Sequence, residues 1–137
     1  MDDDAGLRAL VCALLAEEGY HVLQASNGRE ALAAVARVRP ALVITDVQMP
    51  EVDGPTFMRH YRARGAALPP VIALSASADG LAEAEAAGAD IVLPKPFDLE
   101  DLLGLVEWLV PCWLATTGRR NAALRMHARR LAAECQV

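Results

Sequence analysis

Three short apolar runs constrain the fold of this chain more than any other feature of its sequence. They lie at 41–46 (ALVITD), 71–76 (VIALSA) and 90–95 (DIVLPK), and each contains a nearly continuous apolar stretch. Such runs are typical of strands that are buried on both faces, as in a parallel sheet. Successive parallel strands need a long crossover connection, which is usually a helix. The runs therefore predict strands that alternate with helices.

The segments between these runs have helical periodicity. Leucine and valine recur at helical spacing over residues 7–15, and we expect Gly19 to end that helix. Asn27 and Glu30 have the spacing of a capping box in front of a second helix. Further helices are expected near 55–64, over 79–88 and after Asp98, and a short strand is expected at 21–25 (HVLQA). This order predicts a single domain with a doubly wound parallel α/β sheet.

Charge and cysteine content argue against several classes of protein. Residues 1–110 carry 17 acidic and 8 basic side chains, so we expect no direct nucleic-acid binding by this part. Three cysteines without a regular spacing predict reduced thiols, and the acidic first residues are unlike a basic leader. The most apolar stretch, 102–115, is too short to span a bilayer and contains a glutamate and a proline. We expect a soluble, cytoplasmic protein.

Polar residues stand at the carboxyl ends of the expected strands, where such sheets bind their ligands. These residues are Asp46, Ser75 and Lys95, and Lys95 is the only lysine in the chain, against twelve arginines. A carboxylate can attack phosphorus, while a hydroxyl and an ammonium group can stabilise phosphoryl oxygens. Mg²⁺ would fit if further carboxylates stood beside Asp46. The acidic run 2–4 is the candidate, although acidic residues there could equally cap the first helix.

The motifs ITDVQMPEVDG, ALSAS and LPKPF follow an acidic run and a helix ending in EEGY. Together they resemble the receiver domain of two-component response regulators, over about residues 2–110. The resemblance implies a flavodoxin-like, five-stranded sheet of order 2-1-3-4-5 and a phosphoryl group taken from a sensor histidine kinase or phosphotransfer protein. It also implies a downstream protein partner and no enzymatic activity beyond phosphorylation and hydrolysis at its own aspartate. The oligomeric state stays open, with a homodimer among the options.

The resemblance assigns the metal site residue by residue. Asp46 would be the phosphoacceptor and a ligand of Mg²⁺. Asp3 would bind the metal directly, with Asp2 just behind it, and the backbone carbonyl of Gln48 would be a further ligand. Asp4 falls outside this set and is left as a helix cap.

The remaining assignments concern phosphoryl binding and signalling. Ser75 stands at the hydroxyl switch position, and Lys95–Pro96 is a candidate cis peptide bond beside the site. Many receivers carry an aromatic residue three positions before the lysine, whereas this chain has Val92. A valine has little rotameric freedom, so we expect signalling through the 75–80 loop and the 79–88 helix.

Two other functions stay open. Haloacid-dehalogenase-type phosphatases also combine a nucleophilic aspartate with a hydroxyl, a lysine and acidic metal ligands. Their nucleophile is followed two residues later by an acid catalyst, and Gln48 occupies that position here. The other alternative is a degenerate receiver that serves as a protein-interaction scaffold.

The basic C-terminal tail, 111–137, carries five arginines and one acid. We expect a loop over 111–118 and then a helix, which would either lie back on the acidic receiver part, 1–110, or dock a partner. The tail is too short for a DNA-binding effector domain, so a stand-alone receiver is expected.

The resemblance places the first strand directly before Asp2, where the chain has only Met1. One explanation is a reading frame that begins some five to seven residues earlier, about one strand length, with a valine codon read as Met1. Otherwise the neighbouring strands collapse together, or a partner subunit fills the gap. In each case we expect Asp2 and Asp3 to be poorly held and to bind Mg²⁺ weakly.

Overall fold

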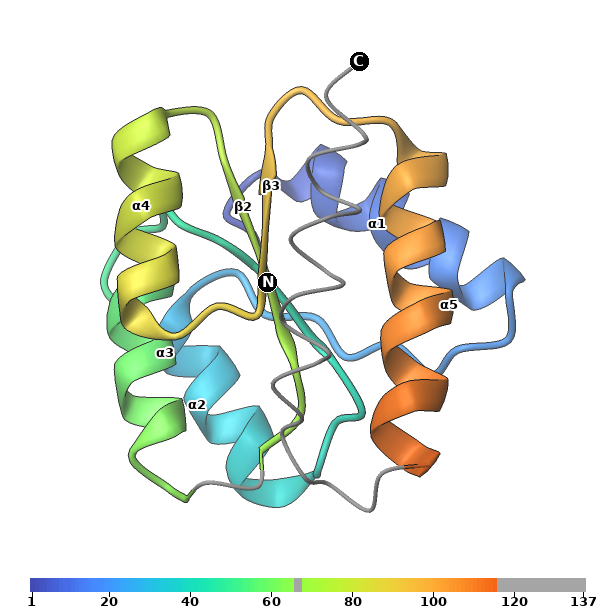
Figure 1. The fold of residues 1–137 in the computed structure, drawn as a ribbon, viewed down its shortest axis with the longest axis horizontal. Coiled ribbons are helices and arrows are strands. Elements are labelled where there is room, and N and C mark those ends of the chain that lie inside the picture. Colours follow the sequence, from blue (N-terminus) through green and yellow to red (C-terminus); the bar gives the residue numbers. More distant parts are fainter. Residues whose placement is uncertain (66–67, 116–137) are drawn as a thin grey trace.

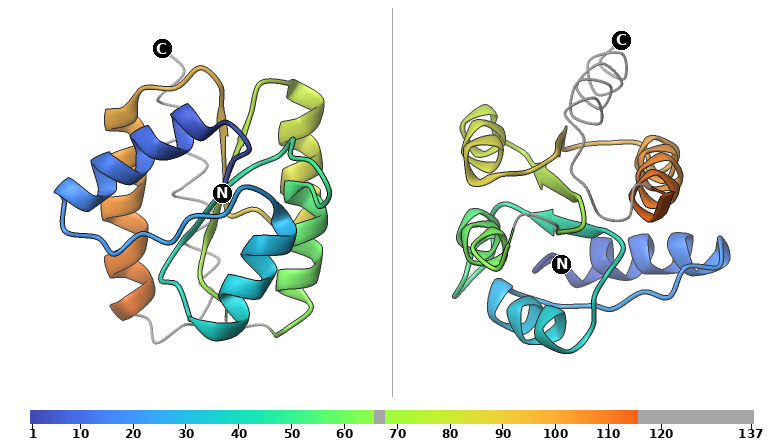
Figure 2. Two further views of the ribbon diagram at one scale, coloured as in Figure 1. Left: turned by 180° about the vertical axis from the view of Figure 1, so that it is seen from behind. Right: turned by 60° about the horizontal axis from the view of Figure 1, so that its bottom comes forward.

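Helices cover both faces of a small parallel sheet in this computed structural model, which describes residues 1–65 and 68–115 (Figure 1). Along the chain the elements are α1 (Ala5–Glu17), α2 (Gly28–Arg37), β1 (Val43–Asp46), α3 (Gly54–Arg62), β2 (Val71–Ser75), α4 (Ala78–Ala87), β3 (Ile91–Pro94) and α5 (Leu99–Ala115). The sheet has the order β1-β2-β3 within the described residues, and both strand pairs are parallel. Helices α2, α3 and α4 lie on one face, and α1 and α5 lie on the other (Figure 2). This is the doubly wound α/β fold expected from the sequence.

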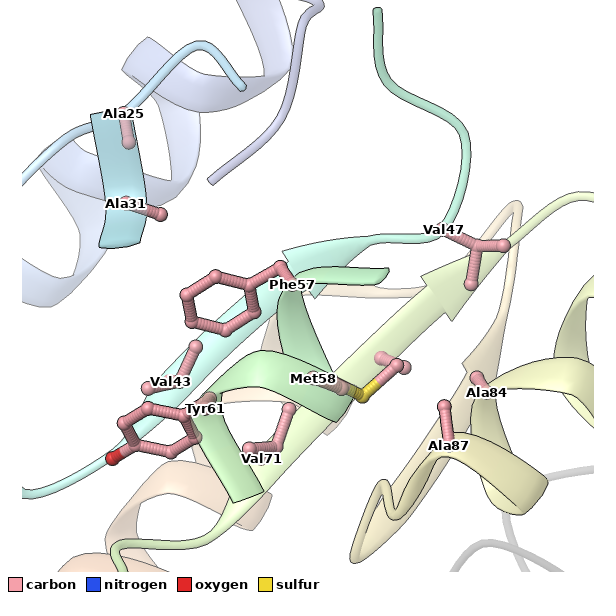
Figure 3. Close-up of a cluster of buried hydrophobic side chains, with 11 residues drawn as sticks. Ala25, Ala31, Val43, Val47, Phe57, Met58, Tyr61, Val71, Ala84 and Ala87 are labelled. Carbon is pink, nitrogen blue, oxygen red and sulfur yellow. The ribbon is translucent and has the colours of Figure 1, made fainter. Parts of the chain in front are cut away.

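The central strand, β2, is buried along its whole length. Its side chains alternate between two hydrophobic clusters: Val71 and Ala73 pack toward α2, α3 and α4, and Ile72 and Leu74 pack toward α1 and α5. Figure 3 shows the first cluster, in which Phe57 and Met58 of α3 are fully buried. Because both faces are covered, the strand is apolar throughout rather than alternating with polar residues.

The expected helix caps are present, with one change. The Asp4 carboxylate accepts hydrogen bonds from the backbone N–H groups of Gly6 and Leu7, at 2.8 and 3.0 Å. The Asn27 side chain accepts one from the N–H of Glu30, at 2.9 Å. The Glu30 carboxylate accepts from the N–H and hydroxyl of Ser26, not from the N–H of Asn27 as a capping box would have it.

The strand predicted at 21–25 is wrong for the described residues, because this segment forms no ladder there. Its contact with the chain start is a single 3.3 Å bond, in which the N–H of Asp2 donates to the carbonyl of Ala25. A strand needs a neighbour for its backbone groups, and within the described residues only Asp2 bonds to this segment. The segment has not collapsed onto β1 either. Within the described residues, the sheet therefore consists of β1, β2 and β3.

Helix α5 runs further than expected. The loop predicted over 111–118 is wrong at its start, since the helix continues through Pro111 to Ala115. Proline costs the helix one backbone hydrogen bond, but the buried face of the preceding turns still packs on the sheet. The predicted tail helix lies outside the described residues. Within the described part of the chain, no helix is long and apolar enough to cross a membrane.

Candidate functional site

The carboxyl ends of the three strands bring Asp46, Ser75 and Lys95 to one edge of the sheet. Asp46 is the last residue of β1 and is only 6% exposed. Lys95 directly follows β3, and its N–H donates to the carbonyl of Ser75, the last residue of β2, at 2.7 Å. The Lys95 Nζ lies 2.9 Å from Asp46 Oδ1. The adjacency of these three residues was predicted from the position of each at a strand end.

Asp2, Asp3 and Asp46 form an acidic cluster at this edge of the sheet. One carboxylate oxygen from each residue lies within 4.8 Å of the other two. Asp2 and Asp46 are buried, whereas Asp3 is exposed. Hard oxygen ligands gathered in this way suit Mg²⁺, which takes a few carboxylates and keeps several waters. The donor set therefore fits the divalent cation that the sequence predicts.

Asp2 is held from several sides, so the expectation that it is poorly held is wrong. Its Oδ1 accepts a 2.9 Å bond from the N–H of Asp4, and its Oδ2 lies 3.1 Å from Lys95 Nζ. The guanidinium of Arg8 donates to the carbonyl of Asp2 at 2.7 Å. Asp3, in contrast, projects into solvent.

The electrostatics follow from crowding three carboxylates around one lysine. Burial raises the pKa of Asp46 above its usual value, against the lowering effect of Lys95, and the nearby carboxylates of Asp2 and Asp3 raise it further. Burial also works against the charge of Lys95, but its hydrogen bonds to Asp46 and Asp2 outweigh this and raise its pKa. One ammonium group faces three carboxyl groups, so the site favours additional positive charge.

Ser75 is 1% exposed, and its hydroxyl is bonded to the loop that follows it. It accepts a 3.2 Å bond from the N–H of Ser77 and lies 3.3 Å from the Ser77 carbonyl. The hydroxyl is thus part of the β2–α4 loop, through which we expect signalling. Val92 is partly buried and packs against the cluster on the α2, α3 and α4 face.

Two glycines belong to the site, although sequence reasoning did not single them out. A Cβ at Gly54 would lie 2.2 Å from the backbone oxygen of Asp46. A Cβ at Gly80 would lie 2.3 Å from Ser75 Oγ. Both positions need glycine because of close approach, not because of positive φ. The signal for Gly54 was its place in the ITDVQMPEVDG motif, but nothing local marks Gly80.

The loop after Asp46 borders an open depression of about 720 Å³. Gln48 is exposed there, and the rim includes Asp3, Asp53, Asp79 and Glu83. A rim with this charge favours cations at the mouth of the site. The expected cis peptide bond is present at Lys95–Pro96, beside the lysine.

A flavodoxin-like α/β sheet with acidic residues and one lysine at its carboxyl edge defines the class of protein. The model of the response regulator receiver domain matches residues 1–107, so this chain belongs to that family. The resemblance predicted from the motifs is confirmed.

Relatives and solved structures agree with this assignment. The chain is 42% identical over 113 residues to the response regulator MprA of Mycobacterium leprae and to that of Mycolicibacterium vanbaalenii, covering 80% of this chain. It covers 49% and 48% of those proteins, so it spans about half the length of the curated relatives. The structure resembles the chemotaxis response regulator CheY4 of Vibrio cholerae, with a TM-score of 0.73, 33% identity and coverage of 79% of this chain and 92% of that one. A putative response regulator from Chloroflexus aurantiacus gives a TM-score of 0.74 at 29% identity, covering 81% and 93%.

Proposed function

We propose that this receiver domain takes a phosphoryl group onto Asp46 in the presence of Mg²⁺ and signals by a conformational change. The observation that carries the proposal is the position of Lys95 Nζ, which lies 2.9 Å from Asp46 and 3.1 Å from Asp2 within the acidic cluster. A lysine that contacts both a buried nucleophile and its acidic neighbour is well placed to neutralise an incoming phosphoryl group.

The chemical step transfers a phosphoryl group from a histidine nitrogen of the donor to a carboxylate oxygen of Asp46. A carboxylate oxygen of Asp46 forms a bond to phosphorus while the bond from phosphorus to the imidazole nitrogen of a donor phosphohistidine breaks. The electron pair of that bond leaves with the imidazole, and Asp46 becomes an acyl phosphate. Lys95 offsets the charge of the phosphoryl oxygens, and the Ser75 hydroxyl is the donor that can turn toward them.

Asp2, Asp3 and Asp46, with the backbone carbonyl of Gln48, are the residues that would hold Mg²⁺. When bound, the ion would screen the carboxylates from the phosphoryl oxygens. Asp2 is the buried member of the pair that precedes α1 and contacts Lys95, so we assign it to orienting the site and Asp3 to direct ligation.

The partners follow from the same proposal. A sensor histidine kinase or a phosphotransfer protein would be the donor, in the cytoplasm, and a protein would read the phosphorylated state. We propose that the receiver extends over residues 1–110 and that the basic C-terminal tail, 111–137, begins within the last turns of α5, which runs to Ala115. Turnover is confined to Asp46 itself, so the chain is not an enzyme acting on free substrates.

The test is incubation with phosphoramidate and Mg²⁺, followed by intact mass measurement. We expect one phosphoryl adduct, which disappears with Asp46→Asn or with a chelator. Glu85→Gln is the matched control: it removes an exposed carboxylate of α4 that does not line the depression at the site, and it should leave the adduct unchanged. Labelling that persists in Asp46→Asn rejects the proposal, and a folded protein that is never labelled favours the scaffold alternative.

A further inference from the structure

Basic side chains gather around the ends of two neighbouring helices, α2 and α3. Segments 31–45 and 54–78 contain five arginines and no aspartate or glutamate. Each helix is followed by a strand of the parallel sheet, so both helices end at the amino edge of the sheet, at the bottom of Figure 1. The acidic cluster lies at the carboxyl edge. The two edges of the sheet therefore carry opposite charge.

One of these arginines, Arg62, is part of the fold. Its guanidinium pairs with Asp90 at 2.5 Å and donates to the carbonyl of Gly88 at 2.9 and 3.1 Å. It also donates to the carbonyl of Pro69 at 3.1 Å. Asp90 in turn accepts from the N–H of Val71 at 2.8 Å. The charge of Arg62 is thus balanced by a carboxylate within the domain.

Arg39 and Arg64 have no such role. Both are exposed and lie just beyond the ends of α2 and α3. Within the described part of the chain, neither side chain forms an ion pair or a hydrogen bond. Arg37 lies in the last turn of α2, where a cation stabilises the helix, but the other two lie outside the helices. Their charge is therefore available to a partner.

Tyr61 has a hydroxyl that the fold does not use. The residue is 2% exposed, and its hydroxyl has no hydrogen-bond partner among the described residues. The ring stacks on Phe57 with 5.5 Å between the centroids, and the Arg62 guanidinium lies 5.7 Å from the ring centroid. Figure 3 shows the hydroxyl at the edge of the cluster, directed away from Phe57 and Met58. Phenylalanine would make the same ring contacts, and an unpartnered buried hydroxyl costs stability.

The arginines lie around this hydroxyl. Burial raises the pKa of Tyr61 to about 12, and the positive charges of Arg62, Arg39 and Arg64 act in the opposite direction. The hydroxyl therefore stays protonated at neutral pH and remains a hydrogen-bond donor. A guanidinium group presents its donors in a fork that matches a carboxylate. Two such groups and one phenol donor favour the same ligand, an oxyanion.

We propose that Tyr61, Arg39 and Arg64 form a docking site for an acidic protein segment. A carboxylate of the segment accepts a hydrogen bond from the Tyr61 hydroxyl and pairs with both arginines. The site extends to Arg37 and to Val38, which is 49% exposed and offers an apolar contact beside the charges. Because the hydroxyl is enclosed, a neighbouring side chain turns aside on binding. Arg39 is exposed and outside any helix or strand, so it is free to do so.

The charge of the whole domain favours a short acidic segment over nucleic acid. Residues 1–110 carry 17 acidic and 8 basic side chains, and a long polyanion would be repelled by most of this surface. A short segment meets the amino edge alone. This edge lies opposite the end of β1 that carries Asp46, so the proposal does not depend on phosphorylation.

The experiment adds an oligoglutamate peptide to the full chain and follows amide chemical shifts by NMR. The affinity is taken from the shifts of residues 61–64, so that binding at the basic C-terminal tail is not counted. Arg39→Gln and Arg64→Gln should each weaken binding at least about threefold. Tyr61→Phe should weaken it at least about twofold, with a melting temperature that is unchanged or higher.

Arg29→Gln is the matched control. Arg29 is an exposed arginine at the start of α2 and pairs with Glu51 at 3.3 Å, so its loss changes the net charge equally but not the site. Binding should then be unchanged. An equal loss of binding in Arg29→Gln and Arg39→Gln would overturn the proposal, because net charge alone would explain it.

Two further results would also overturn the proposal. A lower melting temperature for Tyr61→Phe would show that the hydroxyl is bonded within the fold. Shifts of residues 61–64 with a single-stranded oligonucleotide, but not with oligoglutamate, would show that the partner is a nucleic acid.

Discussion

The two edges of β1 differ more than any other two regions of the molecule. Toward β2 the strand is paired from Val43 to Asp46, and the residues beneath it are almost fully buried. Toward the 21–25 segment it is bonded only to Met1 within the described part of the chain. A slot between β1 and this segment contains cavities of about 360 and 90 Å³. Leu23, across the slot, is 51% exposed.

The difference between these two edges shows that an apolar strand sequence alone does not ensure that both edges of the strand are paired. Both edges of β1 belong to the same four residues, so the strand has one composition and two environments. The site lies across this boundary. Asp46, Ser75 and Lys95 lie at the carboxyl ends of the three paired strands. Asp2 and Asp3 lie next to Met1, at the end of the slot.

The largest predicted effect on stability comes from comparing a side chain packed under the paired strands with one that borders the slot. Phe57→Ala should lower the free energy of unfolding by about 3–5 kcal/mol, because the ring is 0% exposed and the neighbouring strands cannot close the cavity. Leu23→Ala, in a half-exposed side chain at the slot, should change it by no more than about 0.5 kcal/mol. Urea denaturation of both variants measures the difference. A similar cost at both sites would mean that the slot is closed in solution.

The dependence of stability on pH should report on the buried amine of Met1 at the end of the slot. The Met1 amine binds a proton with a pKa of 8.0 when exposed and about 6 in the fold, so the unfolded chain takes up protons first as pH falls. Stability is therefore present in full above pH 8 and is lost as pH falls from 8 to 6, by about 3 kcal/mol. Acetylation of the Met1 nitrogen should remove this dependence. Melting curves of both forms across the window provide the measurement, and parallel curves would contradict the buried amine.

The smallest predicted change in stability concerns two glycines that lie away from the slot. Gly54→Ala places a methyl group 2.2 Å from the Asp46 carbonyl and should cost about 1–3 kcal/mol through displaced backbone. Gly104→Ala, in α5, meets nothing within 4 Å and should stabilise by about 0.5–1 kcal/mol, because alanine favours a helix interior. Thermal unfolding of the two variants should show shifts of opposite sign. A stabilising Gly54→Ala would show that this loop is loosely packed.

The sequence alone determined the elements that depend on local pattern. The runs at 41–46, 71–76 and 90–95 predicted β1, β2 and β3, since a strand buried on both faces must be apolar throughout. The helix caps at Asp4 and Asn27 followed from residue type. The edge of the sheet that carries the site could also be predicted, because parallel strands bring their carboxyl ends to one side.

The tertiary structure decided what depends on a neighbour. Residues 21–25 have a strand-like sequence but form no strand in the described part, because no ladder partner lies beside them there. The need for glycine at 54 and 80 came from close approach of segments far apart in the chain. Asp2 is held by Lys95 from the far end of the domain, which no local pattern encodes. Local sequence sets what each segment can form, and packing sets which backbone groups find a partner.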